Sequence, residues 1–369
     1  MLIPPYYAAS GGEYTQKRLN MSKRIKLQAI PINRTDYCQF LIVSQKNYSL
    51  TYYAEHTKKC SHDVINRFLR NEKYTPSLLW EHIKNDVIFS SNGYTIFDDT
   101  VLNKRNTKQI EIARSQYSGA TGRVTKGIGV VSLVYYNPDI NKFWVIDYRI
   151  FAPDHDGATK LEHLLNMLNN AVYSKKILFQ TVLFDTWYST HKIMQHVDSL
   201  GKYYYAPIKA NRNVSKTHDS KPYKAVKELT FSDEEIRHGV EIHIKGFAKN
   251  KHVNLFKFTV STNRVEYVVT NNKTHKSSKA AQDECGFRWV IESMHREIKQ
   301  LTGIERCQCR KQHIQRNHIS CAFLVWAFLK RTANTIGKTV YQIKLGLLDD
   351  YMQQQLRSPS LRYLEPNIA

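Results

Sequence analysis

The sequence predicts an α/β protein with an inserted β-rich segment and a helical N-terminal region. Three observations support this fold class. Apolar strand-like runs alternate with amphipathic helical patterns between residues ~94 and ~200. A basic segment at ~202–279 alternates with period two, as antiparallel strands do. A polar helical pattern precedes both. The chain has 369 residues, which is enough for two or three domains.

The overall charge indicates a polyanionic partner. The chain has 54 Lys and Arg against 32 Asp and Glu, a net charge of +22. Nucleic acid is the simplest partner for such a surplus. The longest apolar run, Cys321 to Leu329, is too short to span a bilayer and predicts a buried helix. We therefore expect no membrane association.

Residues 1–29 are expected to be a loosely ordered leader without a signal-peptide core, in which Met21 is an alternative start. The six cysteines have no CxxC pair and fit reduced thiols in a cytoplasmic protein. Cys307, Cys309 and His313 are conceivable zinc ligands, although their spacing is not a standard one.

Residues 30–90 are predicted to be helical, with a helix, a turn and a helix between Tyr48 and Asn71. Ser61 is placed to cap the second helix. This segment is either a DNA-binding helix-turn-helix or an ordinary helical hairpin. The second helix is expected to bury Val64, Ile65 and Phe68, and to expose His62, Asp63, Asn66 and Arg67, which have side chains that reach bases or phosphates.

Residues 91–201 are predicted to contain strand, strand, strand, helix, strand and helix, in this order. The second and third strands are close enough in sequence to form a hairpin. Asp98 and Asp99 end the run "YTIFDD", and Asp185 follows the run "TVLF". Side chains at strand ends lie at the sheet edge, where α/β proteins usually place their sites. Each aspartate is alternatively an ordinary turn residue.

Residues 202–279 hold 16 Lys and Arg against 7 Asp and Glu, a surplus of nine, and are predicted to be an inserted basic β subdomain. The alternative is that its lysines only keep the protein soluble. Residues 280–335 are predicted to hold two helices, and residues 336–369 to be a helical or loose tail.

The first of these two helices carries two stripes at helical spacing. An apolar stripe is formed by Phe287, Ile291, Met294, Ile298 and Leu301. A charged stripe lies about 100° away and consists of Arg288, Glu292, His295 and Lys299. This second stripe is either a solvated face with ion pairs or part of a site.

Asp98, Asp185 and Glu292 together predict a metal site. Mg²⁺ takes one or two carboxylates plus substrate phosphate, and two such ions catalyse in-line displacement at phosphorus. We expect two Mg²⁺ ions, for which Mn²⁺ substitutes, with Asp99 as the substitute for Asp98. The cations beside the carboxylate, Arg288, Lys299 and His295, are expected to contact DNA phosphates.

These motifs resemble those of a known family. Arg288, Glu292 and Lys299 match the Arg-x3-Glu-x6-Lys signature of DDE transposases of the insertion-sequence-four-like group, in the branch typified by insertion sequence 701. Cys285 stands where that group has a tyrosine. "FDDT" resembles the group's Asp-x-Thr motif, which selects Asp98, and "LFDTWYS" resembles its second motif. The resemblance covers residues 45–335 approximately.

The resemblance implies an RNase H-like core in a bacterial, nucleoid-associated enzyme. This enzyme would cut the inverted repeats at the ends of an insertion sequence and join them to target DNA, as a homodimer in the synaptic complex. The insert would then line the DNA channel. Two alternatives are an RNase H-like nuclease without strand transfer and a non-catalytic, transposase-derived DNA-binding protein. Trp187 is expected to contact DNA or to pack in the core, and Trp289 to pack away from the apolar stripe and the metals, against the insert.

Overall fold

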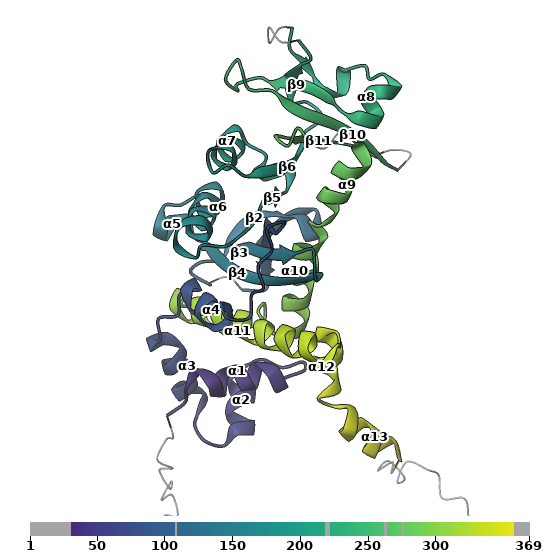
Figure 1. Ribbon diagram of the computed structural model, residues 1–369. Helices are drawn as coiled ribbons and strands as arrows, with labels where there is room; N and C mark the ends of the chain where they lie inside the picture. The colour runs from purple at the N-terminus through teal and green to yellow at the C-terminus, as the bar shows by residue number, and fades with distance from the viewer. Residues whose placement is uncertain (1–30, 108, 218–221, 262–263, 275–276, 358–369) are drawn as a thin grey trace, which may run out of the picture.

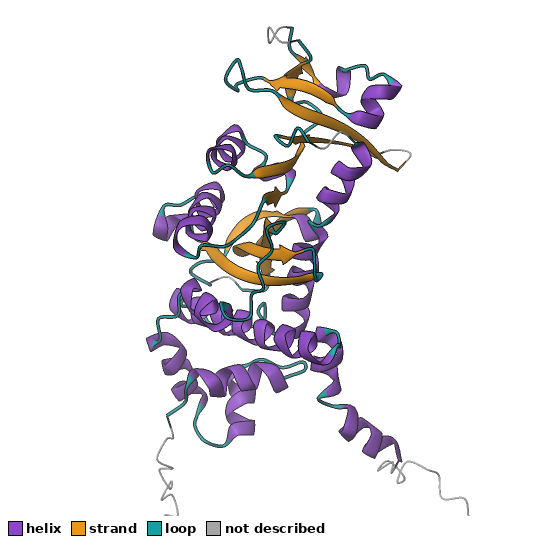
Figure 2. Ribbon diagram, viewed as in Figure 1, coloured by secondary structure: helices purple, strands orange, loops and turns teal. Residues whose placement is uncertain are grey.

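The computed structural model describes residues 31–357 except 108, 218–221, 262–263 and 275–276, so the predicted leader lies outside the described part. The molecule is elongated, with helices at one end, a sheet with flanking helices in the middle, and a mostly β region at the other end (Figure 1). The helices α9 and α10 run from the β region down the side of the middle layer (Figures 1 and 2).

The α-helices are α1 Arg34–Val43, α2 Leu50–Thr57, α3 His62–Asn71, α4 Pro76–Ile83, α5 Pro153–Asp156, α6 Lys160–Asn169, α7 His191–Ser199, α8 Asp233–His238, α9 Ser278–Gly286, α10 Trp289–Leu301, α11 Gln312–Ile336, α12 Val340–Gly346 and α13 Asp349–Arg357. Short helical turns, of which one is a π-helix, occur at η1 Gly119–Thr121, η2 Asn170–Ser174, η3 Thr186–Tyr188 and η4 Val226–Glu228. The strands are β1 Tyr94–Asn103, β2 Arg114–Ser118, β3 Arg123–Asn137, β4 Lys142–Phe151, β5 Thr181–Phe184, β6 Tyr203–Ile208, β7 Asn213–Ser215, β8 Lys224–Ala225, β9 Val240–Ile244, β10 Val253–Ser261 and β11 Arg264–Thr270.

The strands form one mixed sheet in the order β2-β3-β1-β5-β6-β11-β10-β9-β7-β8, with β4 paired to β3. β1 is antiparallel to β3 and parallel to β5, and β5 is parallel to β6. The predicted order of elements between ~94 and ~200 is found, including the β3–β4 hairpin. The strand β2 was not predicted, because its sequence "RSQYS" is polar.

The change of composition near residue 202 does not mark the end of the central sheet. β6 lies beyond it and pairs parallel to β5, with Thr181 opposite Tyr203. On its other side, β6 pairs antiparallel to β11, from Tyr205 opposite Thr270 to Ile208 opposite Tyr267. The basic β region therefore continues the central sheet through β6. Backbone pairing sets this connection, and composition does not report it.

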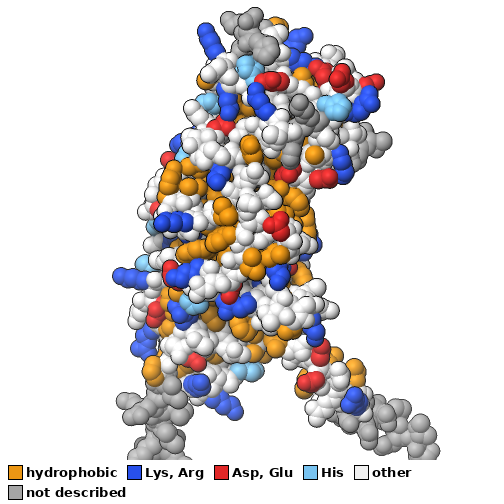
Figure 3. Space-filling model, viewed as in Figure 1, with side chains coloured by type: hydrophobic (Ala, Val, Ile, Leu, Met, Phe, Trp, Pro, Cys, Tyr) orange, Lys and Arg blue, Asp and Glu red, His pale blue; other side chains and the backbone are white. Residues whose placement is uncertain are grey.

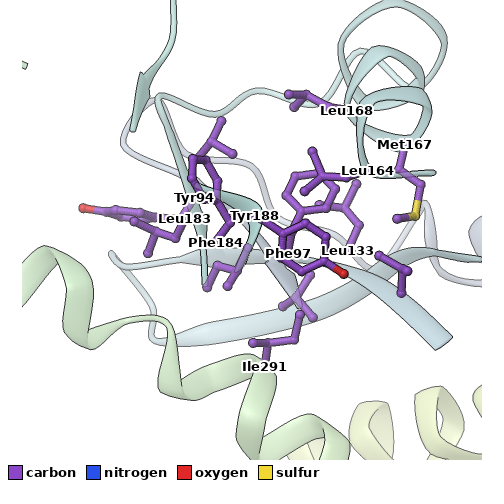
Figure 4. Packing of buried hydrophobic residues seen from close by; sticks show 14 of the residues in the cluster. Tyr94, Phe97, Leu133, Leu164, Met167, Leu168, Leu183, Phe184, Tyr188 and Ile291 are labelled. Atoms are coloured by element: carbon purple, nitrogen blue, oxygen red, sulfur yellow. The ribbon is translucent and has the colours of Figure 1, made fainter. Parts of the chain in front are cut away.

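The main core lies on both faces of the central strands. Phe97, Leu133 and Phe184 come from three different strands and are fully buried. Figure 4 shows Leu164 of α6 on one side of these strands and Ile291 of α10 on the other. Because successive side chains of a strand point to opposite faces, a strand that is apolar throughout makes both faces of the sheet apolar, and each face needs a helix to cover it.

The N-terminal helices pack around α11, and they do not form a separate body. Their buried side chains, including Leu41, Ile65 and Leu69, share one cluster with Val325 and Leu329 of α11. The central part of α11 is buried, as predicted for the run from Cys321 to Leu329, although Phe328 is exposed.

The side chain of Asn317 on α11 fixes the end of α3. Its amide nitrogen donates hydrogen bonds to the carbonyl oxygens of Leu69 at 2.7 Å and of Glu72 at 2.6 Å. Its amide oxygen accepts a bond from the backbone N–H of Tyr74 at 2.9 Å. Because this buried amide makes three hydrogen bonds to the backbone at the end of α3, it fixes the position of α3 on α11.

The predicted helix, turn and helix correspond to α2 and α3, and Ser61 immediately precedes α3. The hydroxyl of Ser61 makes no capping hydrogen bond. Ile65 is buried as expected, whereas Val64 and Phe68 are only half-buried, and Leu69 takes the second buried position. The helix is rotated slightly from the predicted orientation because it packs on α11 and not on α2 alone.

Gly303 is required by close packing, which leads to a stability prediction. It has a φ of +68°, and a Cβ atom there would lie 2.4 Å from the ring of buried Tyr48. Gly303→Ala should lower the free energy of unfolding by about 2–4 kcal/mol, from strain plus overpacking. Gly337 is the matched control, since it has the same φ but open space around it. Equal losses for both alanine variants in urea unfolding would show that the contact with Tyr48 is unimportant.

None of the helices in the part of the chain that the structure describes is long and apolar enough to cross a membrane.

Candidate active site

Asp98 and Asp185 occupy equivalent places on two neighbouring parallel strands. Phe97 of β1 lies opposite Phe184 of β5, so each aspartate is the next residue along its strand. Asp185 follows the end of β5, as predicted. The prediction that Asp98 and Asp99 end their strand is wrong, because β1 continues to Asn103 in pairing with β3. The edge is formed by the end of β5, and β1 passes beyond it.

Asp98 and Asp99 point to opposite faces of the sheet, as successive strand residues must. Asp98 faces α10, where Nδ1 of His295 lies 3.9 Å from its Oδ2. Asp99 faces α6, where it accepts a hydrogen bond from Lys160 at 2.5 Å and one from the Tyr188 hydroxyl at 2.7 Å. Asp99 is thus held by partners on the face away from α10.

Glu292 lies in the first turn of α10, on the same face of the sheet as Asp98. The helix begins at Trp289, two residues after the predicted apolar stripe begins. Ile291, Met294, Ile298 and Leu301 are buried as predicted, and Phe287 is half-buried against the core. The Glu292 side chain is 51% exposed and remains accessible to a ligand.

Arg288 links two of the three carboxylates. Its Nη1 lies 3.4 Å from Oδ1 of Asp185, and its Nη2 lies 3.5 Å from Oε1 of Glu292. The positive charge of Arg288 also lowers the pKa of Asp98, although burial and the neighbouring carboxylates, which raise this pKa, have larger effects. One guanidinium group therefore brings the three predicted acidic residues into one neighbourhood.

The carboxyl of Asp98 is in an unfavourable electrostatic position. Burial raises its pKa to about 7 from an ordinary value of 3.8, and the negative charges of Asp99 and Asp185 contribute to the increase. The hydrogen bond from the backbone N–H of Asp99, at 2.8 Å, opposes this shift. Nearby carboxylates with too little positive charge between them are the environment that a cation would relieve.

His295 is not on an exposed flank, as the helical wheel predicted. It is buried, and its Nε2 lies 3.3 Å from the Ser132 hydroxyl on β3. Burial, together with the charge of Lys299, lowers the pKa of His295 to about 3, so that the ring is neutral and its contact with Asp98 is not an ion pair. α10 packs on β1 and β3 and buries this position, which leaves the side chain little surface for the predicted phosphate contact.

Lys299 is also committed inside the protein. Its ammonium group donates to the carbonyl oxygen of Val101 at 3.0 Å and lies 3.7 Å from Glu305, and only 18% of the side chain is exposed. These contacts attach α10 to the far end of β1. Lys299 therefore anchors α10, and too little of its side chain is exposed for the predicted contact with a phosphate.

No group of three or more His, Cys, Asp and Glu side chains is arranged to hold a metal ion in the described part of the chain. This applies to Asp98, Asp185 and Glu292, because Arg288 lies between Asp185 and Glu292. It also applies to Cys307, Cys309 and His313. The thiol of Cys309 instead accepts a hydrogen bond from the amide of Asn66 at 3.6 Å.

Two further residues predicted to bind DNA lie on α3. Arg67 is exposed, as expected. Asn66 is half-buried, because its amide turns toward Cys309 in the loop before α11. Contact between α3 and this loop was not visible in the sequence, since the two segments are more than 200 positions apart.

Trp187 and Trp289 are both exposed, by 51% and 60%. The ring of Trp187 packs edge-on against Tyr188, with the Lys160 ammonium 5.8 Å from its centre. The expectation that Trp289 packs against the insert is wrong, because most of its side chain is exposed. It occupies the first position of α10.

A polar cleft of about 390 Å³ begins one residue after Asp185 and was not predicted. It runs between the core and the insert and is lined by Thr186, Trp187, Ser189, Thr190, Ile208, Lys209, Asn211, Arg212, Asn213 and Lys245. Three of these residues are cations and none is acidic. The signal in the sequence was the charge surplus of residues 202–279, which did not indicate where the charges would meet. Lys and Arg side chains also occur along the whole face shown in Figure 3.

The fold and the site define an α/β protein whose mixed sheet brings carboxylates together at the end of a short parallel strand. Residues 94–328 match the model of the transposase DDE domain family. This match covers more than half of the chain, and the chain therefore belongs to this family. No curated protein matches the chain.

Several solved structures resemble the chain distantly. The piggyBac transposase in a synaptic complex with hairpin DNA shares 10% identity over 90% of this chain and 74% of its own, with a TM-score of 0.46. Endonuclease V of Ciona intestinalis, bound to DNA that contains an inosine, shares 10% identity over 56% and 85%, with a TM-score of 0.28. The Mos1 transposase in a pre-cleavage transpososome shares 16% over 47% and 59%, with a TM-score of 0.17.

Proposed function

We propose that this DDE transposase is catalytically active and that it cuts the ends of an insertion sequence and joins them to target DNA. The observation that carries the proposal is the meeting of Asp98, Asp185 and Glu292 around Arg288, from positions 87 and 107 apart in sequence. Within this proposal the core is RNase H-like, and the protein is a bacterial, nucleoid-associated enzyme of the insertion-sequence-four-like group that acts as a homodimer in the synapse.

The donor set suits Mg²⁺ or Mn²⁺. Three carboxylates near one another, one of them buried with a raised pKa, supply the hard oxygen ligands that these ions take. Asp98, Asp185 and Glu292 would hold two ions, and Asp99 is excluded by its bonds to Lys160 and Tyr188. The chemistry that the ions supply when bound is activation of the attacking oxygen and stabilisation of the leaving one.

Arg288 acts as a movable partner of the carboxylates in this proposal. At 3.4–3.5 Å from Asp185 and Glu292, it balances part of their charge in the protein alone. A long side chain that is 28% exposed can turn outward when a cation takes its place. Its guanidinium group is then available to bind a DNA phosphate beside the site.

The cleft next to Asp185 supports the binding of a DNA strand at the site. Lys209, Arg212 and Lys245 offer positive charge without a competing carboxylate among the lining residues. The hydroxyl group of Thr190 adds a hydrogen-bond donor of the kind that contacts phosphate oxygens, whereas that of Ser189 donates to the carbonyl oxygen of Asp185 at 3.4 Å. This is the part of the insert for which we propose a role in the DNA channel.

The test uses the full-length protein and DNA that carries the inverted repeats flanking the reading frame. With Mg²⁺, cleavage at the repeat ends followed by their covalent joining to a second plasmid is the expected result. Cleavage without joining would favour the RNase H-like nuclease. Binding without any cleavage would favour the non-catalytic DNA-binding protein.

Trp187 at the mouth of the cleft gives a specific prediction. A tryptophan at this place can stack on an unpaired base, which contributes roughly 1–3 kcal/mol per base. Trp187→Phe should therefore slow cleavage several-fold while the melting temperature stays the same, because half of the side chain is exposed. Trp289→Phe is the matched control. A fall in melting temperature with unchanged activity per folded molecule would assign Trp187 to packing.

A further inference from the structure

The β2–β3 hairpin carries an apolar pair that the protein leaves uncovered. Tyr117 of β2 lies directly opposite Val124 of β3. The two side chains are 65% and 67% exposed. Directly opposed residues of an antiparallel pair point to the same face and contact each other, and such aromatic–aliphatic pairs are usually buried.

The pair faces the same side of the sheet as the site. Val124 and Ser132 lie eight residues apart on β3, whose pairing is regular over this stretch, so their side chains share one face. Ser132 contacts His295 of α10 and lies opposite Asp98. Tyr117 and Val124 are therefore on the α10 face, beyond the end of that helix.

The hairpin extends past the end of its neighbouring strand. β1 ends at Asn103, opposite Gly127, and the last backbone bond to β3 joins the N–H of Lys104 to the carbonyl oxygen of Lys126. The tip turns at Gly122, whose φ is +61°, and a Cβ atom on Gly122 would meet no other atom within 4 Å. At ~3.3 Å per residue, Val124 lies roughly 26 Å along β3 from Ser132.

The charge around the pair selects the class of partner. There is no Asp or Glu from residue 112 to residue 138, whereas this stretch includes Arg123, Lys126 and Arg114, of which Arg114 is paired with Asp154. Arg123, at the start of β3, is exposed and has no acidic partner in the described part of the chain. A second copy of a chain with net charge +22 would bring like charge to this surface. Double-stranded DNA fits both features, because its phosphates bind cations and its base steps admit apolar side chains.

We propose that the hairpin is a second DNA contact, in which Tyr117 and Val124 form a wedge in the minor groove and Arg123 binds an adjacent phosphate. Apolar wedges flanked by cations are a recurrent way of engaging and bending a duplex. The distance from Ser132, opposite Asp98, to Val124 is roughly 26 Å along β3. On a duplex that runs along this strand, it corresponds to about eight base pairs, at ~3.4 Å per base pair. The inference rests on the proposed function, because it takes DNA as the substrate.

The test measures the binding of the full chain to a fluorescein-labelled duplex of about 40 base pairs, or roughly four helical turns. Tyr117→Ala should weaken binding by about tenfold without changing its salt dependence, since the lost contact is apolar. Arg123→Gln should lower the slope of log K against log salt by about one. Tyr173, which is 66% exposed on η2, is the control, and Tyr173→Ala should bind as the wild type does.

A direct readout comes from Tyr117→Trp, in which the added tryptophan should be quenched when DNA binds, whereas Tyr173→Trp should show no such change. This variant keeps a large aromatic ring, so it also serves if Tyr117→Ala fails to fold. Wild-type affinity in Tyr117→Ala together with an unquenched Tyr117→Trp would overturn the inference and leave the proposed function intact. Dissociation of a DNA-free dimer in Tyr117→Ala would also overturn it, by showing that a second copy covers the pair. Failure of the wild-type chain to bind or cut DNA would count against the proposed function itself.

Discussion

Glu292→Gln is expected to abolish Mg²⁺-dependent DNA cleavage, by more than about a thousandfold, while leaving DNA affinity nearly unchanged. The substitution keeps the shape of the side chain but removes the charge that an ion requires. The side chain is 51% exposed and its ion pair with Arg288 is a long one, at 3.5 Å, so folding should not suffer. Cleavage of end-labelled DNA and fluorescence anisotropy measure the two quantities separately.

Glu234→Gln is the matched control for this variant. Glu234 is also exposed and also lies in the first turn of its helix, α8, but in the insert. Glu234→Gln should cleave DNA at the wild-type rate. Equal cleavage by Glu292→Gln and the wild type would remove Glu292 from the site and with it the three-carboxylate mechanism.

Asp98→Asn is expected to stabilise the metal-free protein at pH 8 while it inactivates the enzyme. The folded protein raises the pKa of Asp98 to about 7, above its ordinary value of 3.8, so the folded state binds this proton more tightly than the unfolded state does. Stability from this group is therefore present below about pH 4 and declines as the pH rises to about 7. Above that pH the folded chain bears the full cost of a buried charge.

The expected gain at pH 8 is about 2–4 kcal/mol in the free energy of unfolding, from roughly 1.4 kcal/mol per pKa unit. The amide oxygen of the substituted side chain can still accept the hydrogen bond from the Asp99 backbone. At pH 4 the variant and the wild type should be almost equally stable. Urea unfolding in EDTA at the two pH values measures both differences.

Asp99→Asn provides the contrast, because Asp99 is paired with Lys160 and with the Tyr188 hydroxyl. Loss of that carboxylate leaves a nearly buried ammonium group without its counter-charge and should destabilise the protein at pH 8. If both variants lost stability equally at pH 8, the two aspartates would be in similar environments, contrary to the structure.

The local sequence pattern was sufficient to predict most of the helices and strands and to identify the candidate acidic residues. The period-two and helical patterns predicted the β3–β4 hairpin, the strand β5 before Asp185, and the apolar stripe of α10. These features depend on neighbours within a few positions, so that the sequence records them directly. The same holds for the pair α2 and α3, whose turn and start were visible as polar residues between apolar ones.

Position within a strand could not be predicted from the strand alone. Asp98 and Asp99 looked like a strand end because apolar residues stop there, yet β1 continues through its pairing with β3. In the same way, β6 looked like part of the insert until its parallel pairing with β5 was seen. Hydrogen bonds between distant segments decide where a strand ends, and they leave no local trace in composition.

By itself, the sequence determined the α/β class, the basic character of the chain and the identity of three candidate carboxylates. These follow from residue type and periodicity. Only the tertiary structure decided that Asp98 faces α10 and Asp99 faces α6, that His295 is buried, and that Lys299 anchors α10 to β1. It also brought Lys209, Arg212 and Lys245 into one cleft beside Asp185. The physical reason is that the accessibility and charge environment of a side chain depend on which distant segments pack against it, and this depends on the packing of the entire fold.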